Sequence, residues 1–300
     1  LTYFVTLPVG IDLPVEEFQA WIKTAEPAEV KEWLLENSDL LSQHGRGSAQ
    51  HRNVQTQFWE IYLESVRKRD LELGLEELRE APVGRETRTK VINAYAHAGI
   101  WKNEEVTVRE FLASDRAVRQ AWGKLVMRGR SGRLEQLSEW MSEHGIEGNH
   151  REVLLDQTLG RLHPDLRKLS FEKRLGWLRQ NLPIDEWETF VNLGFIGEFS
   201  GEKRGLIHGF QEAVAAMPSG QEKAFFVRRA TEAEMHFSVF DIEDRVDEVV
   251  KYLSQIDGAA TRADLVKSWK NSARYKRPEL LPEIEEALNH AGIELEGGQE

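Results

Sequence analysis

Residues 116–133, which read RAVRQAWGKLVMRGRSGR, carry six basic side chains and no acid. The whole chain has a net charge of −12, so this stretch is strongly basic within an acidic protein. Ammonium and guanidinium groups gathered on one face could neutralise the phosphates or carboxylates of an anionic partner. The candidate residues are Arg116, Arg119, Lys124, Arg128, Arg130 and Arg133.

A helix over this stretch would separate its apolar residues from its basic ones. Val118, Trp122 and Leu125 would share the buried face, and the basic side chains would lie on the opposite side. The chain contains 51 acidic residues, so the simpler interpretation is a solvated face whose cations pair with acids of a neighbouring helix. We favour this interpretation over a nucleic-acid surface.

Residues 261–277 form a second basic stretch, with Asp264 as its single acid and with Trp269 and Tyr275 between the basic residues. Its charge predicts a second face for an anionic partner, DNA or RNA included. The basic residues are Arg262, Lys267, Lys270, Arg274, Lys276 and Arg277.

The order of helices in this tail, followed by PELLPEIEEALNHAGIEL, resembles a winged-helix module. In that family the third helix enters the major groove of DNA and a wing follows it. Here the third helix is acidic and would repel phosphate, and few residues remain to form a wing. The tail therefore favours a winged helix used for protein contact, or a plain three-helix bundle. The acids are Glu279, Glu283, Glu285 and Glu286.

Glycines recur every three to four residues within residues 194–209, in the sequence GFIGEFSGEKRGLIHG. Such glycines could expose backbone N–H groups to a phosphate, and Lys203 and Arg204 could add charge. The P-loop pattern is not met, because Glu202 separates Gly201 from the lysine. We favour a helix whose glycine face lets another backbone approach, or a simple loop.

Glu198, Glu202 and His208 of the same segment could form an acid–base set if their geometry brings them together. The chain has no cysteine, which excludes thiolate catalysis, disulfides and cysteine-bound metals. No histidine pair has metal-ligand spacing, and no serine lies in a nucleophile elbow. An enzyme acting on a phosphorylated substrate is the weakest alternative, and we expect no cofactor.

Helices must position these groups. Apolar residues at helical spacing predict helices from Pro14 and Pro27 and from Val54, with a loop over residues 43–53 between the last two. Helix stops of the form Gly-Ile recur at Gly99, Gly145 and Gly292, each closely preceded by a histidine. The histidines are expected to hydrogen-bond the last carbonyls of the helix.

Residues 118–149 resemble one helical hairpin of the pentatricopeptide type, over about a tenth of the chain. Neighbouring segments do not repeat the pattern at a fixed interval, so it predicts packed helical hairpins rather than an RNA-reading array. Residues 224–229 and 235–242 are rich in aromatic and β-branched residues and predict a hairpin or a small sheet. Three helices follow, the second opened by a capping pair of Thr261 with Asp264.

The chain has 300 residues, 40% of them hydrophobic, which predicts a folded protein of two domains. No apolar run reaches the length of a membrane span, and the first residues, which begin with leucine, lack the pattern of a signal peptide. Together with the missing cysteine, this favours a cytoplasmic protein without a membrane contact.

We therefore expect a mainly α fold, an irregular array of helical hairpins over residues 1–217. A smaller α+β region with a three-helix, winged-helix-like unit follows over residues 218–300. The expected function is that of a non-catalytic interaction or scaffold protein that binds another protein within a larger assembly, with nucleic-acid binding through the two basic stretches as the alternative. Trp101 and Trp269 are the candidate interface anchors, although burial in the core is the favoured interpretation for each.

Overall fold

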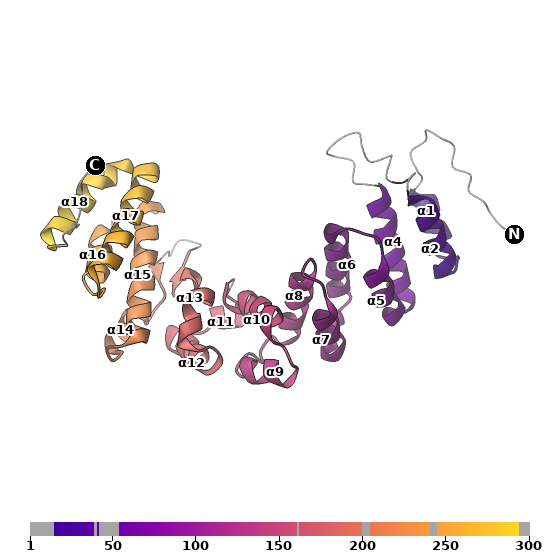
Figure 1. Ribbon diagram of the computed structural model, residues 1–300, viewed down its shortest axis with the longest axis horizontal. Coiled ribbons are helices and arrows are strands. Elements are labelled where there is room, and N and C mark those ends of the chain that lie inside the picture. The colour runs from indigo at the N-terminus through magenta and orange to yellow at the C-terminus, as the bar shows by residue number, and fades with distance from the viewer. Residues whose placement is uncertain are drawn as a thin grey trace. The chain divides into compact units, whose positions relative to one another are not determined.

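The computed structural model describes residues 15–38, 41, 54–160, 162–199, 205–240 and 245–293. Helices account for most of these residues, so the protein is mainly α-helical, as predicted (Figure 1). They fall into two compact units, one ending at Gly129 and the other beginning at Arg130. The domain boundary expected at residue 217 lies within the second unit and stays a prediction. The loop expected over residues 43–53 lies outside the described residues.

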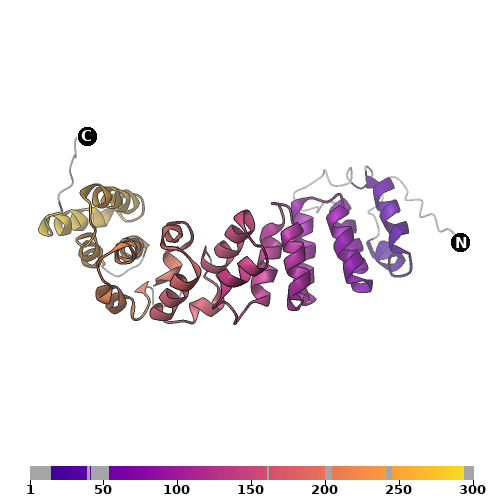
Figure 2. The same cartoon turned by 60° about the horizontal axis from the view of Figure 1, so that its bottom comes forward.

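The first unit is a succession of helices that pack on their neighbours, α2 on α4, α4 on α5 and α6, and α6 and α7 on α8 (Figures 1 and 2). Trp59, Tyr62 and Leu63 of α4 are fully buried and form the centre of its core. The elements are α1 (Val15–Trp21), α2 (Pro27–Glu36), α4 (Val54–Arg69), α5 (Leu71–Glu80), α6 (Arg85–His97), the 3₁₀ helix η1 (Ile100–Lys102), α7 (Glu104–Ala113) and α8 (Arg119–Gly129).

Two residues hold α5 close to its neighbours. A Cβ at Gly74 would lie 2.7 Å from Cα of Arg67, so α4 and α5 approach through glycine. The carbonyl of Gly74 accepts a hydrogen bond from the buried hydroxyl of Tyr95 on α6, at 2.8 Å. Burial raises the pKa of this tyrosine, which therefore keeps its proton and remains a donor.

The second unit contains shorter helices and one ribbon of two strands. Its elements are α9 (Leu137–Glu143), α10 (Gly148–Leu155), the π-helical η2 (Asp156–Gly160), α11 (Pro164–Arg167), α12 (Phe171–Asn181), η3 (Ile184–Glu186), α13 (Trp187–Phe190), η4 (Leu193–Phe195), β1 (Gly197–Glu198), β2 (Gly205–Leu206), α14 (Phe210–Ala216), α15 (Gln221–Phe240), α16 (Val246–Leu253), α17 (Ala259–Lys276), η5 (Pro278–Leu280) and α18 (Leu281–His290). The two helices of the pentatricopeptide-like segment, α8 and α9, belong to different units.

Helix α15 lies at the centre of the second unit, packed on α14, α16 and α17 (Figure 1). Phe226 lies 5.1 Å from Phe171 and 6.2 Å from Phe210 between ring centroids, which joins α15 to α12 and α14. The prediction of strands over residues 224–229 and 235–242 is wrong up to Phe240, because this segment is one helix. It is buried on several faces, so its aromatic and β-branched residues obscure the helical period.

The glycine-rich segment forms the ribbon rather than a helix. Strand β1 pairs antiparallel with β2, with Gly197 opposite Leu206, and the N–H of Ile207 continues the pairing to the carbonyl of Ile196. The expected glycine-faced helix is therefore wrong. Glycine is a poor helix former, and Gly205 adopts a φ of 155°, outside the helical region.

The three glycine helix stops are confirmed, with φ of 83° at Gly99, 61° at Gly145 and 63° at Gly292. The ring of His144 lies 3.0 Å from the carbonyl of Trp140, as expected for a histidine at a helix end. The tail forms three helices as predicted, α16 to α18. The capping pair is wrong, because α17 begins two residues before Thr261 and has no side-chain cap.

Candidate interaction surfaces

The first basic stretch forms α8 together with the loop around it. Asp115, just before α8, accepts hydrogen bonds from the N–H groups of Ala117 at 2.8 Å and Val118 at 3.1 Å. The carboxylate of Asp115, which is the acid nearest in sequence to the basic stretch, thus accepts backbone hydrogen bonds in the turn before α8. The predicted apolar face is buried at 2 to 6% exposure, and consists of Val118, Ala121, Trp122, Leu125 and Val126.

A close backbone approach brings the end of α8 against η1. A Cβ at Gly129 would lie 2.5 Å from the carbonyl oxygen of Trp101, so only glycine fits there. The half-buried ring of Trp101 lies between two cations, with Arg128 Cζ 5.0 Å and Lys102 Nζ 5.6 Å from its centroid. Lys124 precedes Arg128 by one turn of α8 and is exposed. We call these four residues the α8 patch.

The cations of α8 lack acidic partners, which corrects the expectation that neighbouring acids pair with them. In the part of the chain that the structure describes, no carboxylate lies within 4.0 Å of the basic groups of Arg116, Arg119, Lys124 or Arg128. Elsewhere in the first unit Lys31, Arg67, Lys68, Arg79, Lys90 and Arg109 all form ion pairs. Lys23 and Arg85 of this unit are also exposed and have no ion pair with the described residues, so what distinguishes α8 is that several such cations lie on one helix.

The last two basic residues of the stretch belong to the second unit. Arg130 is only 6% exposed, lies 4.1 Å above the ring of Trp140 and donates to the carbonyl of Arg133 at 2.8 Å. It stabilises the fold and does not present its charge to a partner, which corrects that prediction. Arg133 is exposed.

The turn between these arginines is fixed by Asp165. Its carboxylate accepts the N–H of Gly132 at 2.6 Å and the hydroxyl of Ser131 at 2.8 Å. These two hydrogen bonds, the first above all, hold the pKa of Asp165 below its usual value.

The second basic stretch lies on α17, where most of its cations have partners within the unit. Lys270 pairs with Glu285 at 3.0 Å. Arg277 donates to the carbonyl of Ser238 at 3.0 Å and pairs with Glu279 at 3.2 Å. Arg262 donates to the carbonyl of Ile256 and Arg274 to the side chain of Asn271, whereas Lys267 is exposed. Two of the six cations of this face are thus paired with carboxylates of the unit, and Arg262 is bound to a backbone carbonyl.

Trp269 is not a surface anchor, because it is only 1% exposed and its indole N–H donates to Ser238 at 2.9 Å. Tyr275, six residues further along α17, is instead 82% exposed. Its neighbour Lys276 lies over the rings of both Tyr275 and the 49% exposed Phe240, at 5.0 and 5.8 Å. His236 stacks on Phe240 with 4.5 Å between ring centroids. We call His236, Phe240, Tyr275 and Lys276 the aromatic patch.

The sequence interpretation missed half of the aromatic patch. His236 and Phe240 were assigned to a strand, and only their spacing of four residues, which places them on one face of a helix, could have joined them.

Glu198 lies on β1 and His208 follows β2, and both are exposed. Glu202, Lys203 and Arg204 lie outside the described residues, so the acid–base set stays a prediction. Arg174, buried beside this segment, uses its guanidinium to hold the carbonyls of Leu166, Leu169, Arg167 and Phe195. Burial lowers the pKa of Arg174, and its hydrogen bonds fix the backbone segments around it. Within the described ranges, no cluster of acidic and histidine side chains could hold a metal ion.

No protein-family model, no curated protein and no solved structure matches this chain. None of the helices over the described residues has the length and apolar character needed to cross a bilayer. The surfaces described above are thus the basis for a functional proposal.

Proposed function

We propose that this protein is a non-catalytic helical interaction protein, whose α8 patch binds an acidic surface of a partner protein. The observation that carries this proposal is the group of cations around Trp101 that have no ion pair with the described residues. The proposed setting is the cytoplasm, with which the absence of cysteine agrees.

An acidic partner would supply the counter-charges that α8 lacks. Arginine and tryptophan are enriched among the residues that dominate protein interfaces, and here Arg128 lies over the ring of Trp101. Two cations already lie over the ring, and the backbone of Trp101 is packed against Gly129, so we expect little entropy to be lost on binding.

The aromatic patch supports an interaction role for the second unit as well. Tyr275 and Phe240 are two of the three large hydrophobic side chains that are exposed among the described residues. Exposed aromatic residues beside a cation are typical of a protein-binding surface. Lys276 gives this patch the same charge preference as the α8 patch.

A protein partner fits the charges better than a nucleic acid does. The positive potential of the α8 patch is local, because Glu105 on α7 is exposed three residues from Lys102, and a short acidic surface of a protein needs less of it than the continuous backbone of a nucleic acid. Nucleic-acid binding remains the second candidate function, because a base could stack on Trp101 between cations that neutralise phosphates.

The test is fluorescence anisotropy with the full chain and labelled probes across a salt series. The probes are a glutamate-rich peptide of about 20 residues and single- and double-stranded DNA and RNA of about 20 nucleotides. The variant combines Lys102→Ala, Lys124→Ala and Arg128→Ala. The matched control, Lys23→Ala, Arg85→Ala and Lys173→Ala, removes the same charge from exposed positions outside both patches and both basic stretches.

We expect salt-sensitive binding of the acidic peptide that falls about tenfold or more in the α8 variant and less than about twofold in the control. An equal loss in both variants, or no binding at low salt, would reject the α8 patch. Oligonucleotide binding at least about tenfold tighter than peptide binding, and lost in the same variant, would replace the protein partner by a nucleic acid.

A further inference from the structure

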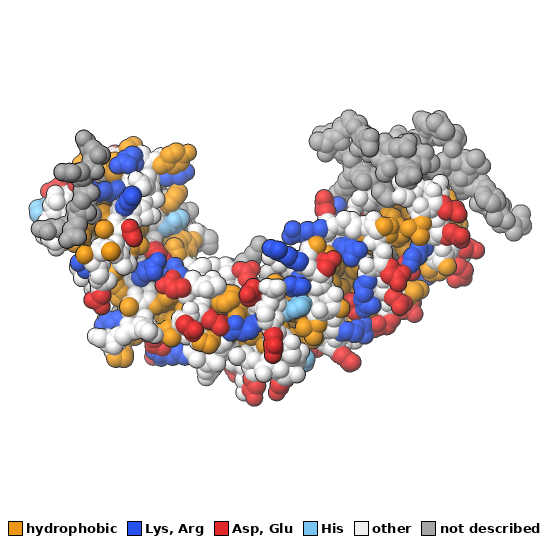
Figure 3. Space-filling model, in the orientation of Figure 1, with side chains coloured by type: hydrophobic (Ala, Val, Ile, Leu, Met, Phe, Trp, Pro, Cys, Tyr) orange, Lys and Arg blue, Asp and Glu red, His pale blue; other side chains and the backbone are white. Residues whose placement is uncertain are grey.

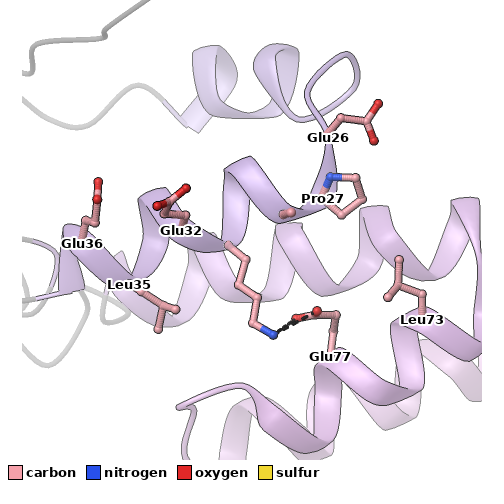
Figure 4. A pocket seen from close by; sticks show the side chains of 9 residues that line it. Glu26, Pro27, Glu32, Leu35, Glu36, Leu73 and Glu77 are labelled. Atoms are coloured by element: carbon pink, nitrogen blue, oxygen red, sulfur yellow. Dashed lines mark hydrogen bonds and ion pairs between the residues drawn. The ribbon is translucent and has the colours of Figure 1, made fainter.

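A groove with the opposite charge lies between α2 and α5 in the first unit. It encloses about 620 Å³ and is lined by nine residues (Figure 4). Figure 4 shows Leu35 of α2 and Leu73 of α5 on either side of the ion pair that links Glu77 to α2. Pro27 and Ala28 add apolar surface at the start of α2. Apolar side chains of both helices thus flank the ion pair of the groove.

The rim of this groove is acidic. Glu26, Glu32 and Glu36 are exposed, and no basic group of the described chain lies within 4.0 Å of their carboxylates. Lys31, the lysine of the lining, is 3.0 Å from Glu77 and 2.9 Å from Glu80, and these carboxylates raise its pKa. Glu77 and Glu80 therefore neutralise the charge of Lys31, and the three exposed glutamates of the rim give the groove a negative potential. Figure 3 shows many acidic side chains over α2 and α5.

The exposure of Leu35 sets this groove apart from the rest of the described surface. Leu35 is 48% exposed, and it is the one aliphatic side chain among the large hydrophobic residues that are exposed in the described ranges. A partner that covered Leu35 and Leu73 would remove apolar area from water, and cations beside its apolar face would meet the rim.

We propose that the α2–α5 groove binds a basic amphipathic helix of a partner protein. The stretch of α2 between Glu26 and Glu36 is about 15 Å long, which matches roughly three turns of a docked helix. An apolar stripe on that helix would lie against Leu35 and Leu73, and lysines or arginines on its flanks would face the rim. This groove selects the opposite charge to the α8 patch and uses other helices, so the inference goes beyond the proposed function.

A divalent cation does not fit these acids. The rim carboxylates are spread along α2, and the described residues contain no group of three that could hold a metal ion. The exposed Leu35 beside these acids is also a poor neighbour for an ion, because hard cations prefer oxygen ligands. A partner with apolar and basic side chains would contact both Leu35 and the acidic rim.

The test uses the full chain and two labelled peptides of about 18 residues, in fluorescence anisotropy. One peptide places leucines on one helical face and lysines on its flanks, and the other has the same composition in scrambled order. The groove variants are Leu35→Asn, and Glu32→Gln with Glu36→Gln. The control, Glu29→Gln with Glu76→Gln, removes two charges from α2 and α5 outside the groove.

We expect the amphipathic peptide to bind about tenfold tighter than the scrambled one, and each groove variant to weaken it about tenfold. The control pair, and the α8 variant described above, should change its affinity less than about twofold. Equal affinity for both peptides, equal loss in the control pair, or absence of binding would overturn the proposal. Failure of the α8 patch would leave these outcomes unaffected, because the two tests change different helices.

Discussion

Helices α8 and α17 come from the two most basic stretches of this chain, and each stretch has six cations. On α8, Lys124 and Arg128 face solvent without acidic partners among the described residues. On α17, Lys270 is paired with Glu285, and Arg277 is held by Ser238 and Glu279. Similar composition thus leaves the cations of α8 without ion pairs among the described residues, whereas two cations of the other stretch are paired with carboxylates.

The difference arises from the elements that pack beside each helix. Helix α17 lies against the acidic α18 and the end of α15, which supply carboxylates and a free carbonyl. Helix α8 lies against α6, α7 and η1, where Glu110 is buried and paired with Arg79 and Arg109 instead. Charge density along a sequence therefore predicts an exposed potential only when the neighbouring helices are known.

The largest expected effect concerns the tryptophan of α17. Trp269→Ala should lower the free energy of unfolding by about 3–5 kcal/mol, because it leaves a cavity and removes the partner of Ser238. Tyr275→Ala, on the same helix but 82% exposed, should change it by less than about 0.5 kcal/mol. Urea unfolding followed by circular dichroism measures both, and similar values would contradict the assignment of Trp269 to the core.

A smaller difference in the free energy of unfolding is expected between variants of the cations of the two stretches. Arg277→Ala should cost about 1 kcal/mol of stability, since the carbonyl of Ser238 loses its donor. Lys124→Ala should leave stability unchanged within about 0.5 kcal/mol, because its ammonium has no ion pair with the described residues. Urea unfolding measures both values, and a larger loss of stability for Lys124→Ala than for Arg277→Ala would contradict this prediction.

The last effect, about as large at neutral pH as that of Arg277→Ala, depends on pH and concerns the turn that follows α8. The folded state lowers the pKa of Asp165, so its hydrogen bonds contribute stability above the unfolded value of 3.8 and lose it as pH falls through the folded value. Asp165→Ala should therefore cost about 1 kcal/mol at pH 7, with a difference from wild type that shrinks below about pH 4.

Urea unfolding at neutral and acidic pH measures this difference. The control is Asp264→Ala, an exposed aspartate on α17, for which we expect a smaller change at neutral pH. A difference for Asp165→Ala that stays constant down to about pH 2 would show that the carboxylate charge has no role at this turn.

Local signals in the sequence predicted much of the fold. Pro27 begins α2, and Gly99, Gly145 and Gly292 end helices with positive φ, because these residues act through their own backbone geometry. Helix α15 was mistaken for strands, since its periodicity is hidden when it is buried on several faces. The burial of α15 depends on partners as distant in sequence as Phe171.

The candidate surfaces were predictable only in part. The basic face of α8 followed from helical spacing, whereas the pairing of Lys270 and the burial of Arg130 depend on tertiary contacts. The groove between α2 and α5 could not be predicted, because Leu35 and Leu73 are brought together by packing across a long separation in sequence.

The central position of α15 also has a consequence for the unfolding of the second unit. Phe226, Ala230, Ala233 and Phe237 are fully buried, and helices pack around them. The amide hydrogens of these turns can exchange with solvent only when that packing is lost. In a hydrogen-exchange experiment they should be the slowest of the unit, and their rates would report its global unfolding rather than local fluctuations.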